Sequence, residues 1–164
     1  MRAAPPYNAA RKEVRVVPTA FFEDLQIDQR IVVGKWSVSK EEAVAFARTW
    51  EPQPYHVDEA AARNSIYGSL TVCSLYLFAI CTRLFFDYRP PIAVVAMLGK
   101  DHIVFPHPAR VGDQLVYETA CVDKRVSRTK PDRGIVTLVD RLSNVTGDVV
   151  LSQEVKLLVL TRPA

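Results

Sequence analysis

The fold that we expect for this chain follows from the segment LTVCSLYLFAICT, Leu70 to Thr82. As a helix it would be apolar on every face, but it is too short to cross a bilayer, and Arg83 and Asp87 follow soon after it. A helix that is hydrophobic on all sides is usually buried inside a protein. We therefore predict a long buried helix over about 69–86, with other elements wrapped around it.

Segments with strand character lie on both sides of this helix. RIVVGKWSV precedes it, ending near Val38, and the residues after Pro91 are rich in β-branched side chains with partial alternation. These later segments read IAVVAML, DHIVF, QLVYETACVDKRV, RGIVTLVDRLSNV and DVVLSQEVKLLVL, and a hairpin turn at Thr146-Gly147-Asp148 separates the last two. The layout predicts an α+β fold with a curved antiparallel sheet packed on one long central helix. Such a sheet leaves an edge strand exposed, so we expect a homodimer or a higher homo-oligomer.

A second helix is predicted between the first strand and the long helix. In SKEEAVAFARTW, Ser39 and Glu42 form an S-x-x-E capping box, and apolar residues recur at helical spacing. Two prolines then end this helix, because proline lacks the backbone N–H and favours extended geometry in the residue before it. We expect the run EPQPYH, Glu51 to His56, to be extended and stiff.

Glu51 and His56 are the first candidates for chemistry. The prolines between them hold both side chains at a fixed spacing, with little conformational entropy left to lose. Imidazole exchanges protons near neutral pH, and a nearby carboxylate can orient it or share a water molecule with it. Reactions that add or remove water need such a pair. The alternative is a polar loop between two helices, in which His56 only caps the turn that follows.

The sequence around this pair resembles the MaoC-like dehydratase family, the R-specific enoyl-CoA hydratases of hotdog fold. The family's hydratase motif reads D-x-N-P-x-H-x-D, often in the form D-P-Q-P-F-H-x-D, and residues 51–58 of this chain read E-P-Q-P-Y-H-V-D. Longer stretches are also similar to family segments: AFARTWEPQPYHVDEAAARNSIYGSL, PARVGDQL and DKRVSRTKPDRGIV. The resemblance covers about Phe21 to Leu160. It implies a single hotdog domain over 21–164, preceded by an N-terminal extension over 1–20 that we expect to be flexible.

The resemblance also implies a reaction. In the family, the Asp and His of the motif hold one water molecule and help it to add across the C2–C3 double bond of a trans-2-enoyl-CoA, giving an (R)-3-hydroxyacyl-CoA. By position, Glu51 takes the Asp role, His56 takes the His role, and the backbone N–H of Ser74 stabilises the thioester oxygen. Gln53 and Thr82 would support the pair, although a helical Thr82 more often bonds its own backbone. No metal or redox cofactor is implied, because the CoA thioester is itself the substrate.

Two departures from the family pattern keep other functions open. Glu51 stands where the family has Asp, and Ser74 stands where it has Gly. A non-catalytic acyl-CoA-binding or assembly subunit is therefore a second hypothesis. A third is an acyl-CoA thioesterase of the same fold, which would activate water with a carboxylate, although hotdog thioesterases lack the P-x-H pairing present here.

A basic run could contact the phosphates of CoA. The ten residues from Lys124 to Arg133 include five basic side chains. The resemblance extends through this run, and the candidates for CoA binding are Arg125, Arg128, Lys130 and Arg133. The alternative is a solvated hairpin loop.

Composition argues against several other classes of protein. The net charge of +3 is small and does not indicate a nucleic-acid partner. The three cysteines form no CxxC pair and the three histidines show no metal-binding spacing, so we expect no zinc site. The N-terminus lacks the apolar segment of a signal peptide. We expect a cytoplasmic enzyme of fatty acid metabolism with free thiols and no membrane partner.

Overall fold

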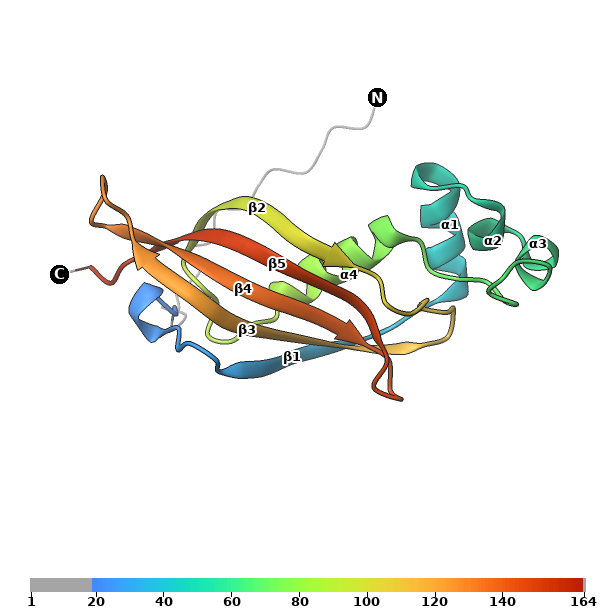
Figure 1. Ribbon diagram of the computed structural model, residues 1–164, viewed down its shortest axis with the longest axis horizontal. Coiled ribbons are helices and arrows are strands. Elements are labelled where there is room, and N and C mark those ends of the chain that lie inside the picture. Colours follow the sequence, from blue (N-terminus) through green and yellow to red (C-terminus); the bar gives the residue numbers. More distant parts are fainter. Residues whose placement is uncertain (1–18, 164) are drawn as a thin grey trace, which may run out of the picture.

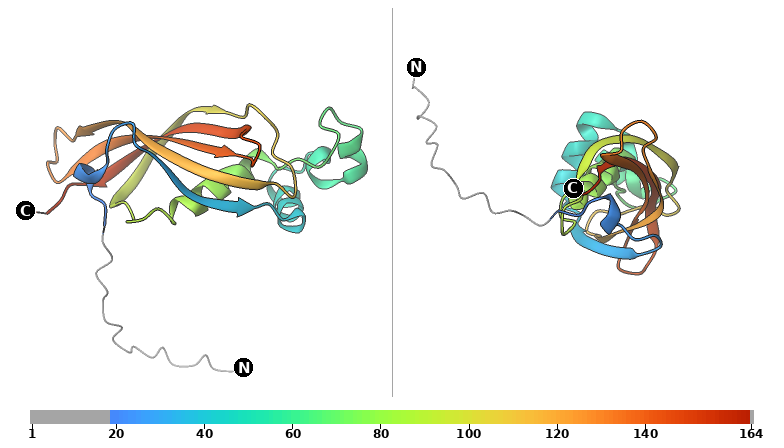
Figure 2. Two further views of the ribbon diagram at one scale, coloured as in Figure 1. Left: turned by 90° about the horizontal axis from the view of Figure 1, so that it is seen from below. Right: turned by 90° about the vertical axis from the view of Figure 1, so that its left-hand side faces the viewer.

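The computed structural model of the chain describes residues 19–163 (Figure 1). The elements in chain order are η1 (Phe22–Asp24), β1 (Arg30–Ser37), α1 (Lys40–Trp50), α2 (Pro54–Val57), α3 (Glu59–Arg63), α4 (Ser74–Phe85), β2 (Val94–Val104), β3 (Gln114–Val126), β4 (Arg133–Ser143) and β5 (Val149–Leu160). The strands form one antiparallel sheet in the order β1-β3-β4-β5-β2. The end-on view in Figure 2 shows this sheet curling around α4. The predicted α+β hotdog architecture is confirmed.

The central helix begins later than the sequence predicts. A helix over 69–86 was expected, but α4 spans only Ser74–Phe85. The residues just before it are extended, and the N–H of Val72 donates to the carbonyl of Ala109 over 2.8 Å. The apolar pattern of this stretch suits either a helix or a buried extended segment. The hydrogen bond to Ala109, which precedes β3, stabilises the extended form.

The run EPQPYH is only partly extended. Gln53 has extended backbone angles (φ −65°, ψ 139°), but Pro54 is the first residue of α2. Proline suits the first turn of a helix, because its missing N–H would have no partner there. The prediction of an extended run is therefore wrong from Pro54 onward, and the resulting turn brings His56 back beside Glu51.

The two segments predicted directly after Pro91 join into a single strand, β2. Its pairing with β5 shifts register at three places, and His102 at the last of them has a positive φ of 50°. Such bulges insert an unpaired residue and turn the following side chains to the other face. They explain why the pattern of β2 looks like two short strands in the sequence.

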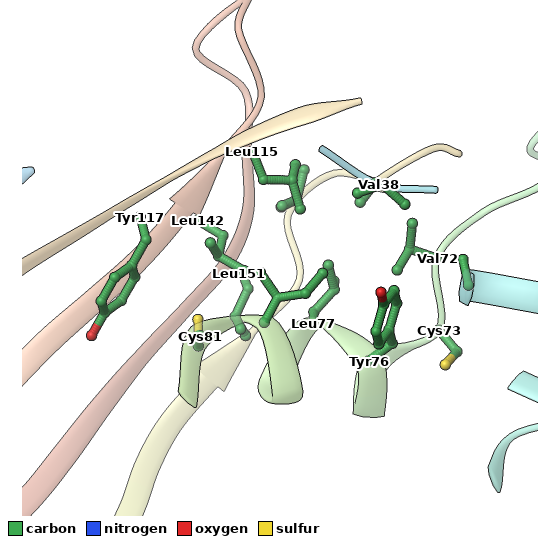
Figure 3. Packing of buried hydrophobic residues seen from close by; sticks show 14 of the residues in the cluster. Val38, Val72, Cys73, Tyr76, Leu77, Cys81, Leu115, Tyr117, Leu142 and Leu151 are labelled. Atoms are coloured by element: carbon green, nitrogen blue, oxygen red, sulfur yellow. The ribbon is translucent and has the colours of Figure 1, made fainter. Parts of the chain in front are cut away.

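Two groups of buried apolar residues fill the space under the sheet. The first surrounds α4, and Figure 3 shows Leu77 and Cys81 of that helix facing side chains from the sheet, among them Leu115, Tyr117, Leu142 and Leu151. The second group lies further along the sheet and consists of Phe22, Leu25, Cys121, Val136, Leu138, Val155, Leu157 and Val159. Together they hold the N-terminus of α4 at one end of the sheet, where the candidate site forms.

A row of four polar side chains crosses the sheet between these two groups. Thr119 and Asp140 are cross-strand partners, as are Asp140 and Gln153. The Thr119 hydroxyl donates to Asp140 over 2.8 Å, and the Gln153 amide donates to the same carboxyl group over 3.2 Å. Lys100 completes the row by donating to the Gln153 carbonyl oxygen over 3.0 Å. These hydrogen bonds offset the cost of burying polar groups inside an apolar core.

Most of the predicted extension, residues 1–20, lies outside the described residues, so its flexibility stays a prediction. Of the two residues that are described, Ala20 is buried and hydrogen-bonds through its backbone to Pro91 and Ala93. None of the helices within residues 19–163 combines the length and the apolar character that crossing a membrane requires.

Candidate active site

Glu51 and His56 face each other across a short turn. Glu51 follows α1 directly, and its N–H donates to the carbonyl of Ala47 over 2.9 Å. The Gln53 carbonyl then accepts the His56 N–H over 2.9 Å, which closes the turn. As a result, Glu51 Oε1 lies 3.9 Å from His56 Nε2. This distance is too long for a direct hydrogen bond, but one oxygen atom can bridge it with bonds of about 2.8 Å to each side.

The orientation of His56 is set by Thr71. His56 Nδ1 lies 2.8 Å from the Thr71 carbonyl oxygen and 3.1 Å from the Thr71 hydroxyl. A carbonyl oxygen can only accept, so we assign the proton of the neutral imidazole to Nδ1. The other nitrogen, Nε2, then carries a lone pair and faces Glu51. His56 is therefore buried and oriented so that Nε2 can accept a proton from a group in the cleft.

The second oxygen of Glu51 contacts the N-terminus of α4. Glu51 Oε2 accepts a hydrogen bond from the Ser74 hydroxyl over 2.9 Å and one from the Leu75 N–H over 3.3 Å. Negative charge is favoured at this end of a helix, where N–H groups lack partners and the helix dipole is positive. Within the described part of the chain, the backbone N–H of Ser74 has no hydrogen-bond partner. The predicted oxyanion donor is thus in the site, and its side chain already binds Glu51.

Thr82 is not part of this arrangement. Its hydroxyl donates to the carbonyl of Phe78 over 2.9 Å, which is the backbone bond expected of a threonine inside a helix. It lies eight residues beyond Ser74 on α4, or about 12 Å along the helix axis. Thr82 therefore does not hydrogen-bond Glu51, and the alternative, a bond to its own helix backbone, is the one present. Gln53 contributes its backbone carbonyl to the turn that carries His56, and its side chain is exposed.

A cleft of about 310 Å³ opens beside the pair. Its lining residues are Glu51, Tyr55, His56, Tyr67, Thr71, Val72, Ser74, Leu77, Phe105, Pro106, His107, Pro108, Ala109 and Val150. Polar groups gather at Glu51 and His56, whereas Leu77 and Val150 give the cleft an apolar part. This combination suits a ligand with one reactive polar group on an apolar chain.

His107 also lines this cleft. Its Nδ1 lies 3.2 Å from the Val149 carbonyl oxygen. The third histidine, His102, lies outside the cleft and pairs with Glu154 over 3.1 Å. Only His56 among the three faces a carboxylate within the cleft.

The predicted CoA-binding run lies away from this cleft within one protomer. Arg125 belongs to β3 and Arg133 to β4, with Arg128 and Lys130 in the hairpin between them. The cleft is at the other end of these strands, roughly 30 Å away for ten residues of strand, and Figure 1 shows the two ends far apart. Arg133 is paired with the neighbouring Asp132 over 2.7 Å. The structure does not bring this run together with Glu51 and His56.

The sequence did not reveal two groups in the site, the carbonyl of Thr71 and the N–H of Leu75. Both belong to the backbone, and every non-proline residue carries the same groups. Their roles depend on where the chain places them, so no residue type could have signalled them.

Cys73 is the N-cap residue of α4 and lies next to the site. Burial raises the pKa of its thiol, and the negative charge of Glu51 acts in the same direction. A thiol of this kind is a poor nucleophile at neutral pH. Among residues 19–163, no three His, Cys, Asp or Glu side chains form a group that could hold a metal ion.

Comparison with known proteins gives a consistent family. Residues 24–141 match the family model described as MaoC like domain. Protein MaoC of Klebsiella aerogenes is 28% identical over 127 residues, which are 75% of this chain and 37% of that protein. The chain therefore spans little more than a third of the length of this relative.

Solved structures show the same relationship. The MaoC-like dehydratase from Rhodospirillum rubrum is 35% identical with a TM-score of 0.82, and the match covers 88% of this chain and 99% of that chain. The (R)-hydratase from A. caviae involved in PHA biosynthesis is 22% identical with a TM-score of 0.67, over 86% of this chain and 99% of that one. A Mycobacterium tuberculosis protein with a double hotdog fold is 18% identical with a TM-score of 0.77, over 88% of this chain and 45% of that one. At these lower identities the last two show the fold alone.

Proposed function

The chain belongs to the MaoC-like dehydratase family, and we propose that it hydrates a trans-2-enoyl-CoA to an (R)-3-hydroxyacyl-CoA or catalyses the reverse dehydration. The observation that carries the proposal is the pair of Glu51 and His56, whose facing atoms lie 3.9 Å apart in the cleft. A fold alone would not support a reaction, because one fold serves many functions.

The pair acts on one water molecule. The lone pair on His56 Nε2 and the nearer oxygen of Glu51 both hydrogen-bond to it. The water oxygen attacks C3, and between them the two side chains take a proton from the water and deliver a proton to C2. Because Thr71 holds His56 Nδ1, the imidazole cannot turn away as the proton moves. No redox cofactor or metal ion enters this scheme.

The thioester oxygen gains negative charge during the addition. The N-terminus of α4 is the nearest group of donors, and the N–H of Ser74 is free to bind this oxygen. Backbone N–H groups at a helix N-terminus stabilise such charge without reorganising. The acyl chain then extends along the apolar part of the cleft, past Leu77.

The active unit is a homodimer joined along β2. This strand is an edge of the sheet and exposes a row of apolar side chains, namely Val94, Val95, Met97, Leu98, Ile103 and Val104. Exposed edge strands with apolar side chains invite pairing with another chain. The other edge, β1, exposes a single large apolar side chain, Val32, so it is the poorer candidate. The double hotdog of the Mycobacterium tuberculosis protein supports two such units acting together.

The test of this function is the loss of enoyl absorbance when the protein is added to crotonyl-CoA. We expect turnover by the wild type and a fall in kcat of about a hundredfold or more in His56→Ala, because a positioned acid or base contributes that much. His102→Ala is the matched control, since His102 lies outside the cleft. Equal turnover in His56→Ala and wild type would refute the role of His56. Release of free CoA in the same assay would indicate a thioesterase instead.

A non-catalytic acyl-CoA-binding subunit is the second candidate. It is favoured by the hydrogen bonds that Ser74 and Leu75 give to Glu51 Oε2, because they hold the carboxylate at the helix N-terminus. Binding of CoA thioesters without turnover of any enoyl-CoA would support this candidate over the hydratase.

A further inference from the structure

Glu51 and Ser74, the two positions that depart from the family motif, are in direct contact. The Ser74 hydroxyl donates to Glu51 Oε2 over 2.9 Å. The motif has Asp at the first position and Gly at the second, and neither the longer acid nor the hydroxyl would be present with those residues. Residues in contact couple energetically, so the two departures act as one unit.

This unit caps α4. The N-cap residue of the helix, Cys73, makes no side-chain hydrogen bond to it. The first N–H groups of a helix have no partner within the helix and need an outside acceptor. Glu51 provides one for the N–H of Leu75, at 3.3 Å, from 24 positions earlier in the chain. Its negative charge is also favoured at this end of the helix.

We infer that Glu51 Oε2 in the free protein takes the Leu75 N–H and sets its negative charge beside the Ser74 N–H, where the thioester oxygen of a substrate binds, and that the Ser74 hydroxyl is the positioning group that holds it there. The inference rests on the proposed function, because both the carboxylate and the thioester oxygen need the N–H groups that open α4. A bound thioester displaces Glu51 Oε2 from these donors. The carboxylate then turns toward His56, and one water molecule still fits between the two side chains.

The length of the side chain makes this competition possible. Glutamate is longer than aspartate by one carbon–carbon bond, about 1.5 Å. An aspartate at position 51 would retract its carboxylate by about that distance, which takes it beyond hydrogen-bond reach of Ser74. The N–H of Leu75 would then be free for the substrate, as the N–H of Ser74 already is.

The experiment measures the affinity for butyryl-CoA, which has no C2–C3 double bond and so cannot be hydrated. Calorimetric titrations compare the wild type, Glu51→Asp, Ser74→Ala and the double variant. We expect each single variant to bind about tenfold more tightly, the effect of one hydrogen bond to a charged group. The double variant should bind no more tightly than either single one, because both remove the same contact.

Kinetics give a second readout that a merely structural role of Ser74 would not produce. If the protein hydrates crotonyl-CoA, Ser74→Ala should lower KM by a larger factor than it changes kcat. Ser74→Ala removes a single hydroxyl from an α-helix, so it keeps the test decisive even if Glu51→Asp folds poorly.

The outcomes separate this inference from the proposed function. Tighter and non-additive binding of butyryl-CoA, without hydration of any enoyl-CoA, would support the inference and reject the hydratase. Unchanged affinity in both single variants, or gains that add in the double variant, would overturn the inference. Absence of binding in all four proteins would also overturn it, because the freed N–H groups would then have no thioester to bind.

Discussion

At the scale of single residues, Asp140 is a buried carboxyl group that no step of the proposed reaction uses. Burial raises its pKa above the ordinary value of 3.8, while hydrogen bonds from Thr119 and Gln153 act in the opposite direction. Below an ordinary carboxyl pKa, Asp140 is protonated in the folded and the unfolded chain alike. As the pH rises, the unfolded chain loses this proton first, so the folded state loses stability until the pH passes the raised pKa.

Asp140→Asn should remove this pH dependence. We expect the free energy of unfolding of the variant, minus that of the wild type, to rise by about 1.4 kcal/mol per pH unit between the ordinary and the raised pKa. Above the raised pKa the difference should be constant. Urea unfolding of both proteins at several pH values from about 4 to about 8 measures it. A difference that does not change with pH would show that Asp140 titrates normally.

The sequence predicts the reacting side chains better than the groups that orient them. Glu51 and His56 follow from a motif with fixed spacing, and the structure places them in one cleft. Ser74 is also there, but the sequence suggested only its N–H, whereas its hydroxyl binds Glu51. The family resemblance assigned that support to Thr82, which lies outside the motif at 51–58. Thr82 lies about two helical turns beyond Ser74 on α4, and so it does not contact Glu51. The sequence alone does not show which of the two hydroxyl groups lies beside Glu51.

At the scale of elements, η1 packs against β4 at a glycine. A Cβ atom added to Gly134 would lie 2.4 Å from the ring of Phe22 and 2.9 Å from the carbonyl oxygen of Arg125. Real Cβ atoms do not come this close to a neighbour, so either η1 or the strand pair must move. The absence of a side chain at Gly134 lets Phe22 of η1 pack into the second apolar group of the core.

Gly134→Ala should therefore destabilise the protein by about 1–3 kcal/mol, the usual cost of overpacking a core. Combining it with Phe22→Leu gives the new methyl group more room. The double variant should lose less stability than the sum of the two single losses. Urea unfolding of the three variants tests this, and simple additivity would show that Phe22 does not limit the space at Gly134.

The order and type of the main elements follow from the sequence, but their limits do not. Alternation and helical spacing indicate the strands and α1, and the capping box at Ser39 marks the start of α1 correctly, with a hydrogen bond from the Glu42 N–H. The start of α4 could not be found in this way, because 70–73 are as apolar as the helix. A hydrogen bond to Ala109, almost forty residues later in the chain, keeps these residues extended.

At the scale of the whole molecule, the two edges of the sheet differ. β2 exposes several large apolar side chains, whereas β1 exposes only Val32. The sequence predicted pairing with a second copy from the presence of an edge strand. It could not say which edge, because the order β1-β3-β4-β5-β2 is a property of the folded sheet.

Leu98→Lys should weaken self-association by at least about tenfold, because it places a charge in the middle of the β2 edge. Val32→Lys is the matched control: Val32 is similarly exposed, 58% against 51% for Leu98, but lies on β1. Sedimentation velocity over a range of concentrations measures both. If Val32→Lys dissociates the protein and Leu98→Lys does not, the β1 edge is the interface.

The polar row of Thr119, Asp140, Gln153 and Lys100 also limits how the chain can misfold. Side chains alternate between the two faces of a strand, so sliding β4 by one residue against its neighbours would expose Asp140 and bury Arg141 instead. The hydrogen bonds to Thr119 and Gln153 would be lost at the same time. A core of purely apolar side chains would penalise neighbouring alignments less, because one aliphatic group can replace another. The polar row therefore specifies the register of the three central strands, β3, β4 and β5.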